Sequence, residues 1–438
     1  MKCILACAVA LAALAVPAAA QWQQVEITEN RILDFALEGS VVWLSANDTG
    51  LVRYDGTTVV HNTTTSGIRQ DSWAYSLLVD SRGLKWLGRD GFRTVDVLDD
   101  AGTPGFLEDD AWSYFTYPDD FANRRVFSMT EDLDGNIWFG MRDEGGDWIG
   151  TLELYVPDAD TVLHYDNAFE PFETQFSNDD VRALAVDDDG RLWIGYFAAG
   201  IDVWDYGDYA TYEDDSWTHY DLGTGLPSNR IFELHVADDG RVLAGTQAGL
   251  VIFDDSGNGP TVIDDLPGSE VRSVATDARG YIWAGTDAGV AMLYPNGTTI
   301  RTFGVEDGLA DPTVDRVDVH GASGTVWALT IGESIADTEL HWFDSDISVP
   351  GQTMPVFPNP WRSDGTRRDV TVLGVAEGSE IRVYDITGER VRTLSTREEP
   401  YTWDTLDDDG YEVPGGLYIL RVEGPDGATT FARVAIIR

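Results

Sequence analysis

Short apolar stretches alternate with turns rich in Asp and Gly along most of the chain, and one such unit recurs. Runs of four to eight apolar residues between Gly and Asp are typical of β-strands. The acidic turn followed by an apolar strand therefore predicts a β-hairpin in each unit. Five units match well: DSRGLKWLG from Asp80, DLDGNIWFG from Asp132, DDDGRLWIG from Asp187, ADDGRVLAG from Ala237 and DARGYIWAG from Asp277. Two weaker copies begin at Glu38 and Gly321.

Each unit has one large apolar anchor, and the anchors follow one another at intervals of 40 to 55 residues. Repeats of this length, made of short strands, are typical of β-propellers. Stretches such as VRALAV, RLWIG, LVIFD and SWTHYDL supply four strands per unit. We predict an all-β chain with a seven-bladed β-propeller. The anchors are Trp43, Trp86, Trp138, Trp193, Leu243, Trp283 and Trp327.

The two ends of the repeat region predict how the ring closes. The seventh unit lacks an outer strand of its own, whereas the stretch from Trp22 to Ile27 (WQQVEI) resembles one. Pairing of this N-terminal strand with the last blade would remove two open sheet edges, which are otherwise sites of aggregation.

The repeat stops near Val349, where prolines become frequent up to Pro360. Alternating strands separated by Gly- or Asp-rich turns follow, which predicts a small immunoglobulin-like β-sandwich. The charge also changes: residues 21–352 carry 61 acidic and 18 basic side chains, whereas residues 353–438 carry 15 and 10. We expect a propeller over residues 21–351 and a second domain over residues 352–438.

The first twenty residues are typical of an export signal. Lys2 precedes an apolar run from Ile4 to Val16, and three alanines end at Ala20. No later run reaches the roughly 20 apolar residues that a membrane helix needs. Both cysteines lie in this segment, so we expect no disulfide in the mature chain. The expected location is the cell surface or the medium, with the periplasm as the alternative.

The net charge of −47 narrows the set of partners. A field of this sign repels nucleic acids and anionic membranes. Excess acid with almost no lysine is typical of a halophilic surface, and Lys85 is the only lysine after Lys2.

Residue patterns for catalysis, cofactors or metals are weak. The six histidines are scattered without metal-ligand spacing, and we name no catalytic residue, cofactor or metal site. Asp132, Asp134 and Asn136, and the run Asp407 to Asp409, leave calcium as an alternative. Recurrence of the same turn in blade after blade favours a structural role for these carboxylates.

Arginine and aromatic residues mark a candidate binding face, because ligands of propellers generally meet the central channel. Such side chains bind carboxylated sugars or peptides by bidentate pairing and stacking. The alternative is that the arginines offset neighbouring aspartates and the aromatics pack between strands. The candidate ligand-binding residues are Arg31, Arg125 and Arg230 just before an innermost strand, Arg182 and Arg272 inside one, and Arg142 and Trp148 from an insertion. Phe169, Phe172 and Phe176 belong to the same insertions.

The D-x-x-G-x-x-W-x-G units followed by Gly-Leu or Gly-Val resemble the periplasmic two-component regulator propeller repeats over residues 21–350. In large members, the propellers form the extracytoplasmic part of a sensor that continues into a membrane helix and a histidine kinase. This chain departs from that pattern, since it has no candidate for either part.

The C-terminal strings PNPWR, EIRVYDITGERVRTL and GGLYILRVEG resemble the immunoglobulin-like domain of flagellar hook-capping proteins and of type IX secretion sorting domains. The resemblance implies export across an outer membrane by that machinery. A retained structural module is the alternative, because the final strand ends in one arginine rather than a lysine-rich stretch.

Taken together, these patterns predict an exported, non-catalytic propeller that binds an extracellular carbohydrate, peptide or protein. One alternative is a propeller enzyme, of lyase or glycosidase type, that acts on extracellular polysaccharide. Another is a self-associating surface-layer component.

Overall fold

The computed structural model describes the strands of the chain and most of their connections. The described residues are 22–25, 27, 31–39, 41–46, 50–55, 58–62, 73–89, 94–102, 110–116, 124–143, 152–165, 176–178, 180–207, 215–254, 259–320, 324–334, 337–344, 356–357, 361–362, 370–372, 379–386, 390–394, 401–423 and 429–438. In this part of the chain, no helix has the length and apolar character needed to cross a bilayer.

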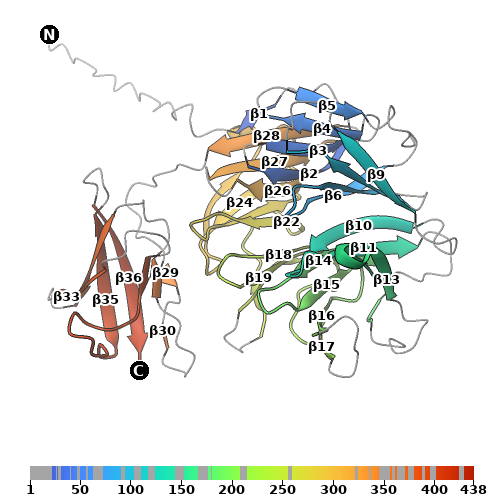
Figure 1. Cartoon of the computed structure of the whole chain (residues 1–438). Helices are drawn as coiled ribbons and strands as arrows, with labels where there is room; N and C mark the ends of the chain where they lie inside the picture. Colours follow the sequence, from blue (N-terminus) through green and yellow to red (C-terminus); the bar gives the residue numbers. More distant parts are fainter. Residues whose placement is uncertain are drawn as a thin grey trace, which may run out of the picture.

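Seven four-stranded antiparallel sheets form a seven-bladed β-propeller, as the repeat predicted (Figure 1). In blades 1 to 6, the strands follow one another from the innermost to the outermost position. Blade 1 contains β2 (Ile32–Glu38), β3 (Val41–Ala46), β4 (Gly50–Tyr54) and β5 (Thr58–Asn62). Blade 2 contains β6 (Ala74–Val79), β7 (Lys85–Arg89), β8 (Thr94–Asp99) and β9 (Ala111–Thr116). Blade 3 contains β10 (Arg124–Glu131), β11 (Ile137–Asp143), β12 (Leu152–Val156) and β13 (Thr161–Tyr165). Blade 4 contains β14 (Val181–Val186), β15 (Leu192–Tyr196), β16 (Ile201–Asp205) and β17 (Ser216–Tyr220). Blade 5 contains β18 (Ile231–Val236), β19 (Val242–Thr246), β20 (Gly249–Phe253) and β21 (Thr261–Ile263). Blade 6 contains β22 (Val271–Thr276), β23 (Ile282–Thr286), β24 (Gly289–Leu293) and β25 (Thr299–Phe303).

The N-terminal strand closes the ring, which confirms the sequence prediction. Blade 7 consists of β26 (Val314–Val319), β27 (Thr325–Ile331), β28 (Thr338–Asp344) and, as its outer strand, β1 (Gln23–Gln24). Gln23 pairs with Trp342, and Figure 1 shows β1 beside β28. Trp22 is buried and packs on Phe343, with ring centres 5.3 Å apart. β1 therefore covers the middle of the outer edge of β28.

Seven clusters of buried side chains fill the seven interfaces between neighbouring blades. For example, one cluster joins Trp138 and Leu154 of blade 3 to Leu184 and Trp204 of blade 4. Another joins Phe35 of blade 1 to Leu329 and Leu340 of blade 7. Stacking of blades is thus what removes the apolar faces of the sheets from water. Six of the seven anchor residues are buried, and Trp327 is half-buried.

The residues that recur among the repeats each have a structural role, and blade 4 shows these roles most completely. One carboxylate oxygen of Asp187 accepts the backbone N–H groups of Asp189 and Arg191, and the other accepts the Trp193 indole N–H at 2.8 Å. Gly190 has a φ of +82°, which the hairpin turn requires. In blade 5, a Cβ on Gly245 would lie 2.6 Å from the Val271 carbonyl oxygen, so this position admits no side chain.

The C-terminal strands form two sheets that pack on each other as a small β-sandwich. Buried residues of both sheets share one core, in which Val370 and Trp403 of the smaller sheet meet Ile381, Leu420 and Val434 of the larger. The smaller sheet has the order β29 (Val356–Phe357), β31 (Val370–Val372) and β34 (Tyr401–Trp403). The larger has the order β30 (Trp361–Arg362), β36 (Thr429–Ile437), β35 (Gly416–Glu423), β32 (Glu380–Asp385) and β33 (Arg390–Leu394). Among the described residues of the propeller lie two short 3₁₀ helices, Pro157–Ala159 and Val305–Asp307.

Candidate functional site

A β-bulge interrupts the innermost strand of every blade near its start. In each case the pairing skips one residue, which has no partner on the neighbouring strand. A bulge redirects the side chain of the extra residue. All seven bulge residues line one cavity of about 270 Å³, which therefore lies on the propeller axis. They are Leu33, Tyr75, Phe127, Arg182, Phe232, Arg272 and Asp315.

Four arginines and four aromatic rings form a continuous series of contacts from blade 2 to blade 6, and five of these residues line the cavity. Successive contacts join Arg125 to Tyr75 (5.1 Å), Tyr75 to Phe127 (5.4 Å), Phe127 to Arg182 (4.0 Å), Arg182 to Phe197 (4.9 Å), Phe197 to Arg230 (4.3 Å), Arg230 to Phe232 (4.9 Å) and Phe232 to Arg272 (5.9 Å), measured between ring centres and guanidinium carbons. We call these eight residues the arginine–aromatic arc. Stacking on rings holds each guanidinium plane by cation–π attraction.

The arginines of the arc differ in their acidic partners. Arg182 pairs with Asp180 at 2.6 Å, and Arg272 pairs with Glu270 at 2.9 Å and Asp315 at 3.1 Å. By contrast, the Arg230 guanidinium meets no carboxylate within ion-pair distance among the described residues, and its Nε is buried without a hydrogen-bond partner there. Arg230 thus holds its charge between two rings, Phe197 and Phe232.

Burial is the largest influence on the pKa of Arg182 within the arc. Burial lowers the pKa of Arg182, and the positive charges of Arg142 and Arg230 act in the same direction. The carboxylate of Asp180 opposes this shift. An additional anion at the arc would relieve the same repulsion.

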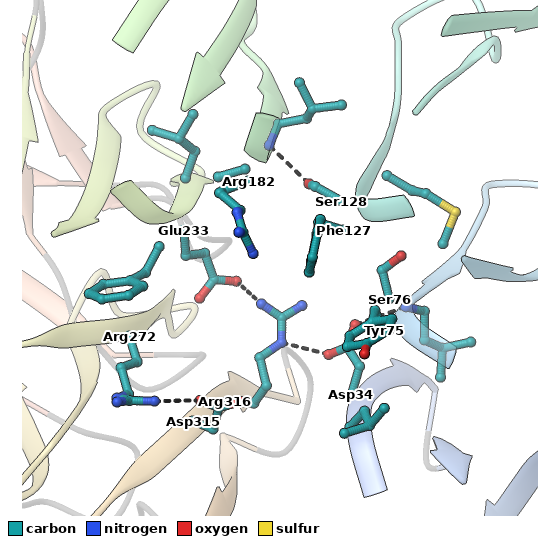
Figure 2. A pocket seen from close by; sticks show the side chains of 17 residues that line it. Asp34, Tyr75, Ser76, Phe127, Ser128, Arg182, Glu233, Arg272, Asp315 and Arg316 are labelled. Carbon is teal, nitrogen blue, oxygen red and sulfur yellow. Dashed lines mark hydrogen bonds and ion pairs between the residues drawn. The ribbon is translucent and has the colours of Figure 1, made fainter. Parts of the chain in front are cut away.

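The inner part of the cavity contains a charged triad. The Arg316 guanidinium donates from Nε to Asp34 Oδ1 at 2.6 Å and from a terminal nitrogen to Glu233 Oε1 at 2.5 Å, as Figure 2 shows. Burial raises the pKa of both carboxyl groups above their ordinary values, against the effect of Arg316. Burial alone would lower the pKa of Arg316, but the two carboxylates raise it above its usual range.

The structure brings five of the seven predicted site residues to one region. Arg125, Arg182, Arg230 and Arg272 belong to the arc, and Arg142 pairs with Asp180 beside it at 3.6 Å. Arg31 directly precedes β2, in the position that Arg230 has before β18, and has a left-handed φ of 66°. Trp148 lies outside the described residues, as do Phe169 and Phe172.

Phe176 follows the alternative, in which the aromatics pack between strands, and does not face the channel. It is buried and packs edge-on against Trp217 at 5.2 Å, so it belongs to the core of blade 4. Sequence reasoning also missed Tyr75, Phe127, Phe197 and Phe232. Alignment of the seven innermost strands on their first apolar residue would have found three of these, because each is the next residue in its strand.

A serine, a histidine and an aspartate meet at the outer side of blade 4, but not as a nucleophilic triad. His219 Nδ1 lies 2.6 Å from Asp202 Oδ1 and 3.0 Å from Ser177 Oγ. A triad needs the serine and the aspartate on opposite ring nitrogens, whereas here one nitrogen serves both. The Ser177 hydroxyl also donates directly to Asp202 at 2.8 Å.

The turn aspartates that left calcium as an alternative accept hydrogen bonds from their own turns. Asp132 accepts the Asn136 backbone N–H at 2.9 Å, and Asp407 accepts that of Tyr411 at 2.8 Å. These contacts confirm the structural role that the recurrence predicted. Within the described ranges, no group of three or more His, Cys, Asp and Glu side chains is arranged to hold a metal ion.

Comparisons with known proteins agree with the repeat. The family model of the two component regulator propeller matches residues 175–198 and 265–288. No curated protein matches the chain. A solved structure of PorZ, an essential bacterial surface component of the type-IX secretion system of Porphyromonas gingivalis, is 17% identical, with a TM-score of 0.57. The match covers 94% of this chain and 60% of that one.

Two other solved structures share the fold. The extracellular domain of the putative hybrid two component system BT3049 from B. thetaiotaomicron is 18% identical over 95% of this chain and 57% of that one, with a TM-score of 0.59. Virginiamycin B lyase from Staphylococcus aureus is 14% identical over 74% of this chain and 98% of that one, with a TM-score of 0.54. The chain spans less than two thirds of PorZ and of the BT3049 domain. Two of its segments thus match the two component regulator propeller model, and its seven sheets form a seven-bladed β-propeller.

Proposed function

We propose that this protein is an exported, non-catalytic binding propeller whose arginine–aromatic arc holds an anionic carbohydrate or peptide. The observation that carries the proposal is the arc itself, because a chain with a net charge of −47 gathers arginines at one end of its central channel. Guanidinium groups bind carboxylates in bidentate fashion, and the rings between them offer flat apolar faces for stacking.

Arg230 is the residue best placed to bind the ligand's carboxylate. Its guanidinium is fixed between Phe197 and Phe232 and has no carboxylate partner among the described residues. Pairing with a ligand therefore requires no internal ion pair to break. Arg182 and Arg272 already pair with acids of the protein, and we assign them a supporting role.

An extracytoplasmic location completes the proposal. The BT3049 structure is an extracellular domain, and PorZ is a surface component of a secretion system. Residues 1–20 serve as the export signal, and residues 352–438 as a domain of the sorting type. Intact-mass spectrometry of surface and medium fractions tests both assignments. A chain that starts at Gln21 and ends near Val349 supports a removed sorting domain, and a retained tail in the periplasm contradicts it.

Titration calorimetry with oligogalacturonates and with oligoglutamate peptides tests the binding site. Arg230→Ala should weaken binding of the active probe by about 10- to 100-fold, and Arg125→Ala should also weaken it. Arg279→Ala is the matched control, because Arg279 also covers a ring, that of Tyr281, but lies in the turn at the far end of its strand. Equal affinities in all four proteins would contradict the proposal. Shortened oligosaccharides after incubation would instead favour the polysaccharide-degrading enzyme.

A further inference from the structure

The cavity inside the arc has room for one ring-sized group. Its volume is about 270 Å³, just below the range of about 300–1,000 Å³ that is usual for pockets of drug-sized ligands. Its walls carry Tyr75 and Phe127 on one side and Arg182 and Arg272 on another, as Figure 2 shows. A chain of several sugars or residues would have to continue through the propeller or leave by the mouth.

Arg316 closes the way through the propeller. Its side chain starts on β26 in blade 7 and reaches Asp34 on β2 in blade 1 and Glu233 on β18 in blade 5. Contacts with two other innermost strands, β2 and β18, place its guanidinium across the channel. All three residues line the cavity, and Arg316 is the most exposed of them: about 32% of its side chain is exposed, compared with 4% for Asp34 and 17% for Glu233.

Backbone contacts hold this barrier in place. Asp34 Oδ2 accepts the Leu77 N–H of blade 2 at 2.8 Å, and Glu233 Oε2 accepts the Val274 N–H of blade 6 at 2.9 Å. Each carboxylate therefore bridges its own blade to the next and binds Arg316 with its second oxygen. Movement of Arg316 together with its two carboxylates would break hydrogen bonds between blades. We therefore regard this triad as a fixed part of the fold and not as an element that opens.

The floor suits a sugar better than a peptide side chain. The second terminal nitrogen of Arg316 has no hydrogen-bond partner in the described part of the chain. Ser76 and Ser128 also line the cavity. The Ser76 hydroxyl donates to the Val126 carbonyl, and the Ser128 hydroxyl accepts the Leu184 N–H and keeps its own proton to donate. Polar groups and two aromatic rings in one cavity match a sugar ring, which has hydroxyl groups on its edge and apolar C–H groups on its face.

We propose that the pocket is blind and recognises the terminal residue of a carboxylated oligosaccharide, with the rest of the chain leaving past the arc. The proposal rests on the proposed function, since it names which part of the ligand that site binds. The terminal ring stacks near Tyr75 and Phe127 and accepts hydrogen bonds from Arg316. Its carboxylate pairs with the arginines of the arc.

A length series of galacturonate oligomers tests this proposal in the full chain. If the pocket binds chain ends, affinity per chain stops rising at two or three residues. Polygalacturonate then competes in proportion to its molar concentration of ends. Leu33→Trp fills part of the cavity from blade 1 and replaces no residue of the arc. This variant should weaken binding by about tenfold or more. Leu222→Trp is the matched control, because Leu222 is an exposed loop residue outside the cavity.

The outcomes separate the two proposals. Affinity that grows in proportion to chain length, together with an unchanged Leu33→Trp variant and a weakened Arg230→Ala variant, overturns end recognition and leaves the binding function intact. Binding of oligoglutamate but of no galacturonate also overturns it and leaves the binding function intact. Binding of neither probe overturns both.

Discussion

The Nε of Arg316 donates a hydrogen bond to Oδ1 of Asp34 at 2.6 Å and thereby joins the last blade of the propeller to the first. The pair is 282 residues apart in sequence. The first and last parts of the propeller are therefore joined at two places: by this ion pair between innermost strands and by the β1–β28 pairing at the outer edge. The same arginine binds Glu233 of blade 5, so one side chain takes part both in closing the ring and in lining the central cavity.

Replacement of this arginine should destabilise the protein in a pH-dependent way. Arg316→Met leaves Asp34 and Glu233 without a cation, and we expect a loss of about 2–4 kcal/mol in the free energy of unfolding at pH 7. Protonation of the two carboxyl groups relieves their repulsion, so the loss should be smaller at pH 4. Urea unfolding at both pH values measures it. The double variant Asp34→Asn, Arg316→Met should recover part of the loss, and a loss that is equal at both pH values would contradict this explanation.

Removal of the Trp22 side chain should weaken the outer closure. Trp22 is 3% exposed and contacts both Phe303 and Phe343, so Trp22→Ala should cost about 3–5 kcal/mol of unfolding free energy. Gln23→Ala is the control: Gln23 lies in the same strand but is exposed, and a change within about 0.5 kcal/mol is expected. Size-exclusion chromatography should also show self-association of the Trp22 variant, since a loosened β1 exposes the β28 edge. Stability equal to that of the control would show that β1 is not needed for closure.

The repeat aspartate should be worth more than its neighbours in the same turn. Asp187→Ala removes the acceptor for two backbone N–H groups and for the Trp193 indole, with an expected cost of about 1–3 kcal/mol. Asp188 lies next to it in the turn and is exposed, so Asp188→Ala should change stability by about 0.5 kcal/mol or less. Thermal unfolding of the two variants side by side measures the difference. Equal melting temperatures would refute the role assigned to the repeat aspartate.

Asp318 should make the protein less stable as the pH rises. Burial raises the pKa of Asp318 to about 6 from an ordinary value of 3.8, although Arg316 and the Val319 N–H act in the opposite direction. The native state therefore binds the proton more tightly than the unfolded state. The resulting stabilisation is fully present below about pH 4 and is lost as the pH rises through about 6.

Asp318→Asn removes this dependence and should raise the free energy of unfolding at pH 7 by about 1–3 kcal/mol relative to the wild type. His235 and His341 act in the opposite direction over the same pH range, because burial lowers the pKa of each to about 4. The difference between variant and wild-type curves is thus the quantity to compare, with Asp238→Asn as an exposed control. A flat difference curve between pH 4 and pH 7 would contradict the prediction.

The sequence by itself determined the number of blades, the hairpin in each and the N-terminal strand that completes the last blade. These features depend on local interactions of residue types that recur along the repeats: an aspartate in the turn, a glycine with positive φ, and an indole at the interface between blades. Asp187, Gly190 and Trp193 do in blade 4 what Asp277, Gly280 and Trp283 do in blade 6.

Tertiary structure decided which aromatic and acidic side chains meet the predicted arginines near the axis. A one-residue bulge in each innermost strand changes which residue faces the channel, and the repeat pattern does not encode that shift. Phe197 and Arg230 lie in different blades, and Arg316 meets Asp34 and Glu233 only because seven blades close on themselves. Phe176 is an example of the opposite kind: it was a candidate for the channel, but it packs against Trp217 in a buried core. The sequence pattern did not indicate this packing. Contacts across a closed ring depend on curvature and closure, which are properties of the assembled blades rather than of any one repeat.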